Sequence, residues 1–373
     1  MQVALVLGTR PEIIKLSPVV EALNALTVSQ GIIHTGQHYD REMDSAHFEE
    51  LCLPQPVTNL KIHSHGRGGR TGLMVQGVWD VLSKLRPGIV VVQGDTDSAL
   101  AGALGAVKLK IPVAHVEAGL RSFDRTMPEE VNRVLIDHMS DLLFAPTETS
   151  AANLESEGLY RGVRVVGNTV VDALQQMGPP GQLESQWTRQ LPATFILATI
   201  HRHSNVDDAG RLRALLDGLR TISERVSLPV VFPLHPRTRI RAASLDLLGA
   251  MEGDSRFVLS PPLPRSDFVA TLSRAAVAIT DSGGVQEEGC ALEVPTVTVR
   301  SSTERPETIA VGANVLAPTP TEMVTAALAA VRQGRGRWPN PFGSGNTGTI
   351  IADALNDFSE LRPPEGEPLR RMH

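Results

Sequence analysis

The chain of 373 residues is long enough for two medium-sized domains, and its 42% hydrophobic and 20% charged residues are typical of a globular protein. This balance excludes a disordered or collagen-like chain, and a net charge of −6 with only 4% aromatic residues disfavours binding to nucleic acid. No apolar run is long enough to cross a bilayer. Cys52 and Cys290 form neither a disulfide framework nor a zinc-binding spacing, so we expect a cytoplasmic protein that does not associate with a membrane.

Short apolar runs alternate with longer helical patterns in the first half of the chain. The runs are apolar throughout, as in strands of a parallel sheet that is covered on both faces. We predict strands at Val3–Leu7, Ile32–Thr35, Ile89–Gln93, Val113–Val116, Leu142–Ala145 and Val163–Val166, with helices at Glu12–Leu26, Gly72–Leu85 and Glu129–Met139.

A segment rich in Gly, Pro and polar residues, Gly178–Gln186, has the composition of a linker. A second series of strands follows at Phe195–Thr199, Val230–Leu234, Phe257–Ser260, Val277–Thr280 and Thr296–Val299. Repeated βα units make the α/β class with doubly wound sheets the expected fold. We predict one domain at residues 1–170 and another at 171–354. The last helical pattern covers Thr347–Leu361, and the C-terminal part, about residues 355–373, is a candidate for packing back on the first domain.

The first candidate motif, Gly8–Glu12 (GTRPE), directly follows the first predicted strand. Ligands of open α/β sheets bind beyond the carboxyl ends of the strands. Pro11 suits a first helical position, and the start of a helix with Arg10 and Lys15 nearby favours an anion. The same residues also suit a plain strand-to-helix turn. No GxGxxG fingerprint of a nicotinamide or flavin cofactor stands here.

A second motif, Asp281–Glu288 (DSGGVQEE), follows the predicted strand Val277–Thr280 and opens a helix. Small residues at the turn allow a phosphate to approach the backbone amides. A carboxylate one turn further can accept hydrogen bonds from ribose hydroxyl groups. The alternative is structural, with Ser282 as an N-cap and two acids that favour the helix dipole.

Acidic residues at strand ends form a third group, which includes Asp95, Glu117 and Glu129. Acid–base work on a sugar ring needs groups on more than one side of a carbon. The alternative for Asp95 and Glu129 is helix capping and an ordinary first-turn acid. Glu117 lies between an apolar strand and Ala-Gly, so it needs a buried partner, for which we propose Arg121.

Two predicted strands in the second half each end in a His and an Arg. His201-Arg202 follows one and His235-Pro236-Arg237 follows the other, a doubled arrangement that suggests an anionic ligand. Neither HExxH nor a pair of cysteines supports a metal site, so we expect none.

The order of the motifs along the chain is specific even though each motif alone is weak. GTRPE, GDT, HVEAGLRS, MPEEVNR, PTETS, GNTVVDA, DSGGVQEE and TERPE occur in this order over most of the sequence. The series resembles that of the non-hydrolysing UDP-N-acetylglucosamine 2-epimerases.

This resemblance implies a glycosyltransferase-B-like fold with two Rossmann-like domains, an active site in the interdomain cleft and a homodimer. It implies interconversion of UDP-N-acetylglucosamine and UDP-N-acetylmannosamine at C2, with a UDP-sugar as the partner molecule and no cofactor or metal. In this chemistry UDP is eliminated to give a 2-acetamidoglucal and then adds back.

The resemblance also assigns roles to residues. The acid–base set is Asp95, Glu117 and Glu129, and His201 stabilises the departing diphosphate. The expected UDP-binding residues are Arg10, Lys15, His201, Ser282, Gly283, Gly284, Glu288 and Arg305, with Glu288 at the ribose. An allosteric or sugar-side role falls to Gln37, His38, Arg202 and His235.

Two departures from the family pattern have consequences. Ser204 stands where the family commonly carries a Glu that would orient a loop. Tyr39-Asp40 follows Gln37-His38 where many bacterial members read Gln-His-Arg and bind a second UDP-N-acetylglucosamine as an activator. Because an acid there repels a diphosphate, we predict reduced or absent activation.

Four alternative functions remain at this point. One is C2 epimerisation of another UDP-sugar, such as UDP-2,3-diacetamido-2,3-dideoxyglucuronate, because the sequences around Gln37 and Glu129 also occur in the family members that act on that sugar. The second is a hydrolysing epimerase that releases ManNAc and UDP. The others are a retaining glycosyltransferase, for which no acceptor site is identifiable, and a non-catalytic UDP-sugar-binding protein.

Overall fold

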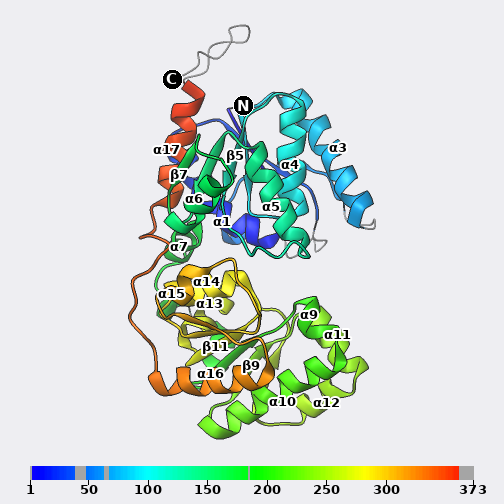
Figure 1. The fold of residues 1–373 in the computed structure, drawn as a ribbon, viewed down its shortest axis with the longest axis vertical. Coiled ribbons are helices and arrows are strands. Elements are labelled where there is room, and N and C mark those ends of the chain that lie inside the picture. The colour runs from blue at the N-terminus through cyan, green and yellow to red at the C-terminus, as the bar shows by residue number, and fades with distance from the viewer. Residues whose placement is uncertain (1, 38–47, 63–66, 184, 361–373) are drawn as a thin grey trace. The chain divides into compact units, whose positions relative to one another are not determined.

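The computed structural model describes residues 2–37, 48–62, 67–183 and 185–360. The chain divides into two compact units (Figure 1). Unit 1 contains Met1–Ala173 and Gly343–His373, and unit 2 contains Leu174–Phe342. No helix of the described residues is both long enough and apolar enough to span a membrane.

Unit 1 is built on a parallel sheet that has seven strands within the described residues, in the order β3-β2-β1-β4-β5-β6-β7. The strands are β1 (Val3–Leu7), β2 (Gln30–His34), β3 (Thr58–Asn59), β4 (Ile89–Gln93), β5 (Val113–Val116), β6 (Leu142–Ala145) and β7 (Val163–Val165). The helices are α1 (Arg10–Ala25), α3 (Arg67–Leu85), α4 (Asp97–Lys108), α5 (Pro128–Met139), α6 (Glu148–Ser156), α7 (Thr169–Gln176) and α17 (Thr347–Glu360).

Successive residues of β1 enter two different hydrophobic clusters. Val3, Leu5 and Leu7 pack with residues of α1 and α17. Ala4 and Val6 pack with residues of α3, α4 and α5 on the other face. Neighbouring side chains of a strand point to opposite faces, so a sheet covered on both sides requires the uniformly apolar strands seen in the sequence.

Unit 2 contains a second parallel sheet, which has six strands within the described residues in the order β10-β9-β8-β11-β12-β13. The strands are β8 (Ile196–Thr199), β9 (Val230–Pro233), β10 (Phe257–Ser260), β11 (Val277–Thr280), β12 (Thr296–Thr298) and β13 (Asn314–Leu316). The helices are α8 (Gln186–Gln190), α9 (His203–Val206), α10 (Ala209–Val226), α11 (Pro236–Ser244), α12 (Leu247–Glu252), α13 (Arg265–Arg274), α14 (Gly283–Ala291), α15 (Pro306–Ala310) and α16 (Pro320–Gln333).

Both sheets confirm the predicted class of two doubly wound α/β units. The strands β1, β4, β5, β6, β10 and β11 have the predicted bounds, and the other predicted strands differ by one or two residues at one or both ends. The edge strands β3 and β13 were not predicted, because they have two and three residues and no apolar run.

The bounds of α1 and α5 differ from the predicted ones by one or two residues, and two other helical features differ more. The predicted linker Gly178–Gln186 is helical in part, with a 3₁₀ turn at Pro180–Gln182 and the start of α8. Ser185 caps α8, since its hydroxyl accepts a hydrogen bond from the backbone N of Thr188 at 3.1 Å. Helix α3 begins at Arg67 instead of Gly72, which adds a turn at its start.

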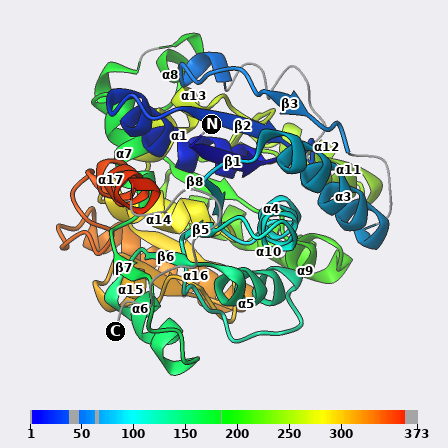
Figure 2. The same ribbon diagram turned by 90° about the horizontal axis from the view of Figure 1, so that it is seen from above.

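The C-terminal helix α17 packs along α1 in unit 1 (Figures 1 and 2). A Cβ at Gly348 would lie 2.6 Å from the carbonyl oxygen of Pro18, so the close approach of the two helices requires a glycine there. The backbone N of Gly348 also donates a hydrogen bond to Asp172 Oδ1 at 2.8 Å. The first turn of α17 is thus held by α7.

Candidate active site

Glu117 directly follows β5 and lies inside unit 1, with an exposed fraction of 5%. Its backbone has φ 69°, which turns the chain sharply at the end of the strand. Lys15 of α1 forms an ion pair with Glu117 Oε1, and the Gln93 amide donates to Oε2 at 2.6 Å. Our prediction that Arg121 is the partner of Glu117 is therefore wrong.

Arg121 instead belongs to a buried network around Asp137 of α5. Asp137 Oδ2 accepts a hydrogen bond from Arg121 Nη1 at 2.7 Å, and Oδ1 contacts His115 Nδ1 at 2.6 Å. Arg121 also binds Glu157 with two parallel bonds of 2.7 and 2.8 Å. Burial alone would raise the pKa of Asp137, but the His115 and Arg121 contacts hold it below its usual range. His115 Nε2 contacts the carbonyl oxygen of Gly94 at 2.8 Å, so the network links the ends of β4 and β5.

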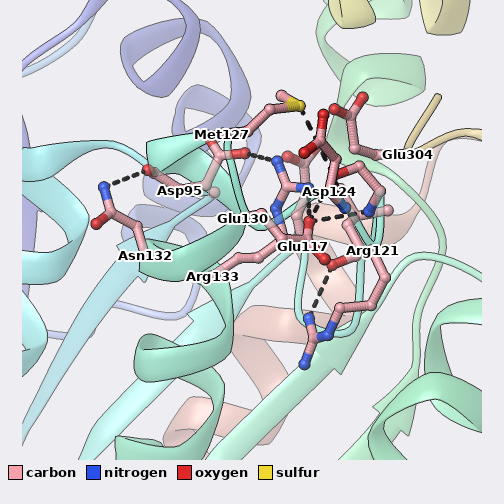
Figure 3. Close-up of polar contacts among 12 residues, drawn as sticks. Asp95, Glu117, Arg121, Asp124, Met127, Glu130, Asn132, Arg133 and Glu304 are labelled. Carbon is pink, nitrogen blue, oxygen red and sulfur yellow. Dashed lines mark hydrogen bonds and ion pairs between the residues drawn. The ribbon is translucent and has the colours of Figure 1, made fainter. Parts of the chain in front are cut away.

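Asp95 lies in the loop after β4, next to the strand that carries Glu117. Its carboxylate forms an ion pair with Arg133 of α5, and its carbonyl oxygen accepts a hydrogen bond from Asn132 Nδ2 at 2.9 Å (Figure 3). The Asp95 side chain is 28% exposed. A Cβ at Gly94 would lie 3.8 Å from Glu117 Oε2, so both acids border the same turn. The structure thus brings Asp95 and Glu117 together in unit 1.

The two neighbouring acids of the MPEEVNR motif have different surroundings. Glu129 is exposed on the first turn of α5. Glu130 is buried and accepts hydrogen bonds from the backbone and hydroxyl of Ser122, at 2.9 and 2.8 Å, and from the backbone N of Phe123 at 2.9 Å. Arg133 Nη1 donates to the same carboxylate at 2.6 Å. Glu130 therefore fixes the loop before α5, while Glu129 is accessible to a ligand.

Glu12 organises the GTRPE turn, a role that the sequence analysis missed. Its buried carboxyl group accepts hydrogen bonds from the backbone N of Gly8 at 3.0 Å, Thr9 Oγ1 at 2.8 Å and Thr96 Oγ1 at 2.7 Å. Burial raises the pKa of Glu12 to about 7, although these hydrogen bonds oppose the shift. Arg10, at the first position of α1, stands on the turn that Glu12 ties to the Asp95 loop.

Gln37 supports the start of α4, because its Oε1 accepts hydrogen bonds from the backbone N and the hydroxyl of Ser98 at 2.9 and 2.7 Å. His38, Tyr39 and Asp40 lie outside the described residues. The predicted allosteric or sugar-side role of this segment stays a prediction.

In unit 2, His201 and Arg202 follow β8 and are held by Asp281, which follows β11. The backbone N of His201 donates to Asp281 Oδ2 at 3.0 Å and that of Arg202 at 2.9 Å. His201 Nδ1 lies 3.0 Å from Asp281 Oδ1. Asn205 Nδ2 donates to Asp281 Oδ2 at 3.0 Å and to the carbonyl oxygen of Val299 at 3.1 Å. This loop is therefore oriented by Asp281 and Asn205, although Ser204 replaces the Glu that we expected to orient it.

Positively charged side chains gather near this loop. Burial lowers the pKa of Arg202, and the nearby charge of Arg300 lowers it further. The His235 ring lies 5.3 Å from the His201 ring, between centroids, and its Nδ1 accepts a hydrogen bond from the backbone N of Arg237 at 3.2 Å. Arg300 is also paired with Glu304, at 2.7 Å, and an anion bound beside Arg202 would relieve the repulsion between Arg202 and Arg300.

Helix α14 begins at Gly283, and the Ser282 side chain makes no capping hydrogen bond within the described part of the chain. The structure thus gives Ser282 the N-cap position without the capping contact. A Cβ at Gly283 would lie 3.0 Å from Arg305 Cζ, so the guanidinium group packs against the start of the helix. Arg305 Nε donates to Glu287 Oε1 at 2.8 Å, and Glu287 is fully buried. A Cβ at Gly284 would lie 3.9 Å from Ser282 Oγ, which is an ordinary contact distance.

Glu288, the expected ribose contact, forms an ion pair with Arg265 of α13. Arg265 is 3% exposed, and its Nε and Nη2 have no hydrogen-bond partner among the described residues. These buried donors could serve a bound molecule. Within the same residues, no group of three or more His, Cys, Asp or Glu side chains is placed to hold a metal ion.

Comparisons with known proteins show which proteins this chain is similar to. The family described as UDP-N-acetylglucosamine 2-epimerase matches residues 21–356. The chain is 45% identical over 361 residues to UDP-N-acetylglucosamine 2-epimerase of Methanocaldococcus jannaschii, covering 95% of this chain and 99% of that protein. It is 40% identical to UDP-2,3-diacetamido-2,3-dideoxy-D-glucuronate 2-epimerase of Pseudomonas aeruginosa, with coverage of 95% and 99%.

A solved structure is equally similar. The crystal structure of the M. jannaschii enzyme in complex with UDP-GlcNAc and UDP matches with a TM-score of 0.90 and 45% identity, covering 96% of this chain and 100% of that one. Similarity over nearly the whole length of both chains confirms the resemblance that the motif order indicated. The chain belongs to the UDP-N-acetylglucosamine 2-epimerase family.

Proposed function

We propose that the protein interconverts UDP-N-acetylglucosamine and UDP-N-acetylmannosamine at C2 of the sugar, without hydrolysis. The observation that carries this proposal is the placement of Asp95 and Glu117 in two adjacent loops of unit 1, which follow the neighbouring strands β4 and β5. The match over its full length to a relative with this name supports the same reading.

The proton on C2 is not acidic, because no carbonyl group neighbours that carbon. The proposed reaction therefore breaks two bonds. A base removes the C2 proton, the C1–O bond breaks, its electron pair leaves with UDP, and a 2-acetamidoglucal remains. UDP then attacks C1 while an acid protonates C2 from the opposite face. The reaction needs carboxyl groups around C2 and positive charge around the diphosphate.

We assign the acid–base set to Asp95, Glu117 and Glu129, all in unit 1. Two features support Asp95 and Glu117: each has a fixed cationic partner, and they border a common turn. The assignment of Glu129 is supported by its exposed position on the first turn of α5. Buried Glu130 is engaged in holding a loop and receives no role in proton transfer.

The diphosphate contacts are assigned to Arg10 and Lys15 of unit 1 and to His201, Ser282, Gly283, Gly284 and Arg305 of unit 2, with Glu288 at the ribose. In unit 2 the support is the group of cations beside the uncapped start of α14. Arg10 stands on the turn that Glu12 holds, whereas Lys15 is paired with Glu117, so Lys15 would act through that ion pair.

Deuterium exchange tests substrate, carbon and reaction class together. UDP-N-acetylglucosamine is incubated with the protein in D2O and followed by ¹H NMR. We expect the H2 signal to disappear while UDP-N-acetylmannosamine appears and free UDP does not accumulate. Accumulating UDP and ManNAc would identify the hydrolysing alternative, and tight UDP binding without exchange at C2 would identify a non-catalytic protein.

Because the P. aeruginosa relative is named for a different UDP-sugar, the substituents on the sugar of the substrate are tested next. The same NMR assay with UDP-2,3-diacetamido-2,3-dideoxyglucuronate separates the two substrates. We expect faster exchange with UDP-N-acetylglucosamine, in line with the higher identity to the M. jannaschii enzyme.

We further propose that the protein works in the cytoplasm as a homodimer. Apolar side chains exposed on the neighbouring helices α3 and α4, Leu73, Trp79 and Val107, support a partner surface there. Sedimentation equilibrium should give twice the mass of one chain, and Trp79→Asp should lower that mass. A wild-type protein that stays monomeric would remove the homodimer from the proposal.

A further inference from the structure

Asp281 is a buried acid that the acid–base set does not include, although it belongs to the DSGG motif. It directly follows β11 and is fully buried. Its Oδ2 accepts hydrogen bonds from the backbone N of His201 and Arg202 and from Asn205 Nδ2, at 2.9 to 3.0 Å. Its Oδ1 lies 3.0 Å from His201 Nδ1. Asp281 thus contacts both the backbone and the ring of His201.

These contacts keep Asp281 in the carboxylate form. Burial alone would raise the pKa of this acid, but the hydrogen bonds and charge of His201, with the bonds from Asn205 and Arg202, lower it below its ordinary value. A carboxylate accepts hydrogen bonds and cannot donate them. His201 Nδ1 must therefore carry a hydrogen in order to bond to Asp281, which leaves Nε2 as the ring nitrogen for a ligand.

We propose that Asp281 is a positioning residue that fixes the ring orientation and the Nδ1–H form of His201. This inference rests on the proposed function for one step only. When the C1–O bond breaks and its electron pair moves to the diphosphate oxygen, His201 must carry a second hydrogen on Nε2 in order to donate a hydrogen bond to that oxygen, while its Nδ1–H stays bonded to Asp281. The adjacent Asp281 carboxylate stabilises the positive charge of the ring.

The same contacts would also exist if Asp281 only held the backbone of the loop. The positioning role and this purely structural role differ in what they require at the His201 ring. A purely structural Asp281 needs only the backbone N atoms and Asn205, and an Asn side chain oxygen in place of Oδ2 could still accept from them, although the additional bond from the backbone N of His201 to Oδ1, at 3.1 Å, would be lost. The amide of Asp281→Asn would then present its NH2 group to His201 Nδ1. Because that group donates, the neutral ring would shift its hydrogen from Nδ1 to Nε2.

Long-range ¹H–¹⁵N NMR of the full chain reads this difference directly. His201 is assigned by the signals missing in His201→Gln, and spectra are recorded where the ring is neutral. We expect the Nδ1–H form in the wild type and the Nε2–H form in Asp281→Asn. Asn205→Ala is the matched control, because it removes a contact to Asp281 Oδ2 but leaves the ring contact, and it should keep the Nδ1–H form.

The wild-type spectrum alone can overturn the proposal, even if Asp281→Asn does not fold. A neutral wild-type His201 that carries its hydrogen on Nε2 contradicts it. An unchanged form in folded Asp281→Asn contradicts it too. Neither measurement depends on turnover, so a protein that did not epimerise its substrate would overturn the proposed function and leave this inference to the NMR result.

Kinetic measurements then test whether Asp281 acts through His201 on the departing diphosphate. We expect Asp281→Asn to lower kcat about tenfold to a hundredfold, with a smaller effect on the Kd for UDP. In a double-mutant cycle, Asp281→Asn should cost little further rate in a His201→Ala background, because the ring through which it acts is absent. Full additivity of the two losses would show that Asp281 does not act through His201.

Discussion

Lys15 forms a buried ion pair with Glu117, although the two residues are 102 positions apart in the chain. One stands on α1 and the other follows β5, so the pair joins the GTRPE turn to the HVEAGLRS motif. Gln93 donates to the second oxygen of the same carboxylate. A change of charge at Glu117 during proton transfer would therefore act directly on Lys15, and the two residues form one electrostatic unit.

Removal of the proposed acids should affect the rate and spare nucleotide binding. Asp95→Asn and Glu117→Gln keep the shape of each side chain but remove its charge. We expect kcat to fall about 10²- to 10⁴-fold, with the Kd for UDP within about threefold of wild type. NMR turnover and calorimetric UDP titration measure the two quantities. Asp80→Asn, on an exposed position of α3, is the control and should retain wild-type values. Loss of UDP affinity equal to the loss of rate would contradict the assignment.

The start of α14 should be sensitive to side-chain volume. A Cβ at Gly283 would lie 3.0 Å from Arg305 Cζ, so Gly283→Val must displace that guanidinium group. Ser282→Pro places a ring and removes a backbone N–H at the N-cap, which donates to Thr280 Oγ1 at 3.0 Å in the wild type. We expect both to weaken UDP binding by about tenfold or more, which is about 1.4 kcal/mol.

Calorimetric titration of UDP checks this prediction. Gly249→Val is the matched control, because it lies on the exposed side of α12 in the same unit and a Cβ there meets no described atom within 4 Å. It should leave the Kd for UDP unchanged. Equal UDP affinity in Gly283→Val, Ser282→Pro and wild type would remove the start of α14 from the proposed site.

The sequence was sufficient to predict the sheets because a strand buried on both faces must be apolar at every position, as in β4 (Ile89–Gln93). The sequence was not sufficient to predict which side chains contact each other in the folded protein. Arg121 was expected beside Glu117, but positive φ angles of 69° at Glu117 and 79° at Gly119 redirect the chain. Arg121 then reaches Asp137, a residue that no motif singled out.

Helix phase explains why two neighbouring acids could not be told apart. Successive residues of a helix differ by about 100° in direction, so one of Glu129 and Glu130 faces the interior and the other faces solvent. The sequence does not fix which one. Asp281, in contrast, could have been singled out from the sequence, because an acid between a buried strand and small residues needs a partner. The same reasoning that singled out Glu117 applies to it.

Activation by substrate should be weak or absent in this protein. Tyr39-Asp40 replaces a basic residue at the position where many family members bind a second UDP-N-acetylglucosamine. We expect initial rates from UDP-N-acetylmannosamine alone to be substantial and to change little on adding traces of UDP-N-acetylglucosamine. Initial rates near zero that rise with such traces would contradict the prediction. Asp40→Arg should increase the response if the acid is its cause.

The packing of α17 on α1 gives a prediction for stability. A Cβ at Gly348 would lie 2.6 Å from the carbonyl oxygen of Pro18, so Gly348→Ala should lower the free energy of unfolding by about 1–3 kcal/mol. Gly72→Ala on α3 is the control, because a Cβ there meets nothing within 4 Å among the described residues, and it should stabilise by about 0.5–1 kcal/mol. Urea unfolding measures both. Stabilisation by Gly348→Ala would show that the two helices do not need this close contact.

Glu12 should make the stability of the protein depend on pH between about 4.5 and 7. Burial raises the pKa of its carboxyl group from 4.5 to about 7, so the folded state binds a proton that the unfolded state releases in this window. The stability due to the protonated form is fully present below pH 4.5 and is lost as pH rises through 7.

Glu12→Gln resembles the protonated acid, since its amide can accept from Gly8 N and donate to Thr96 Oγ1. The variant should therefore gain stability relative to wild type as pH rises, by up to about 3 kcal/mol. Urea unfolding of both proteins at pH 5, 6, 7 and 8 measures the gain, and Glu21→Gln, on an exposed position of the same helix, reports the effect of removing an exposed carboxylate. A difference between wild type and Glu12→Gln that stays constant over this range would mean that Glu12 is ionised in the folded protein.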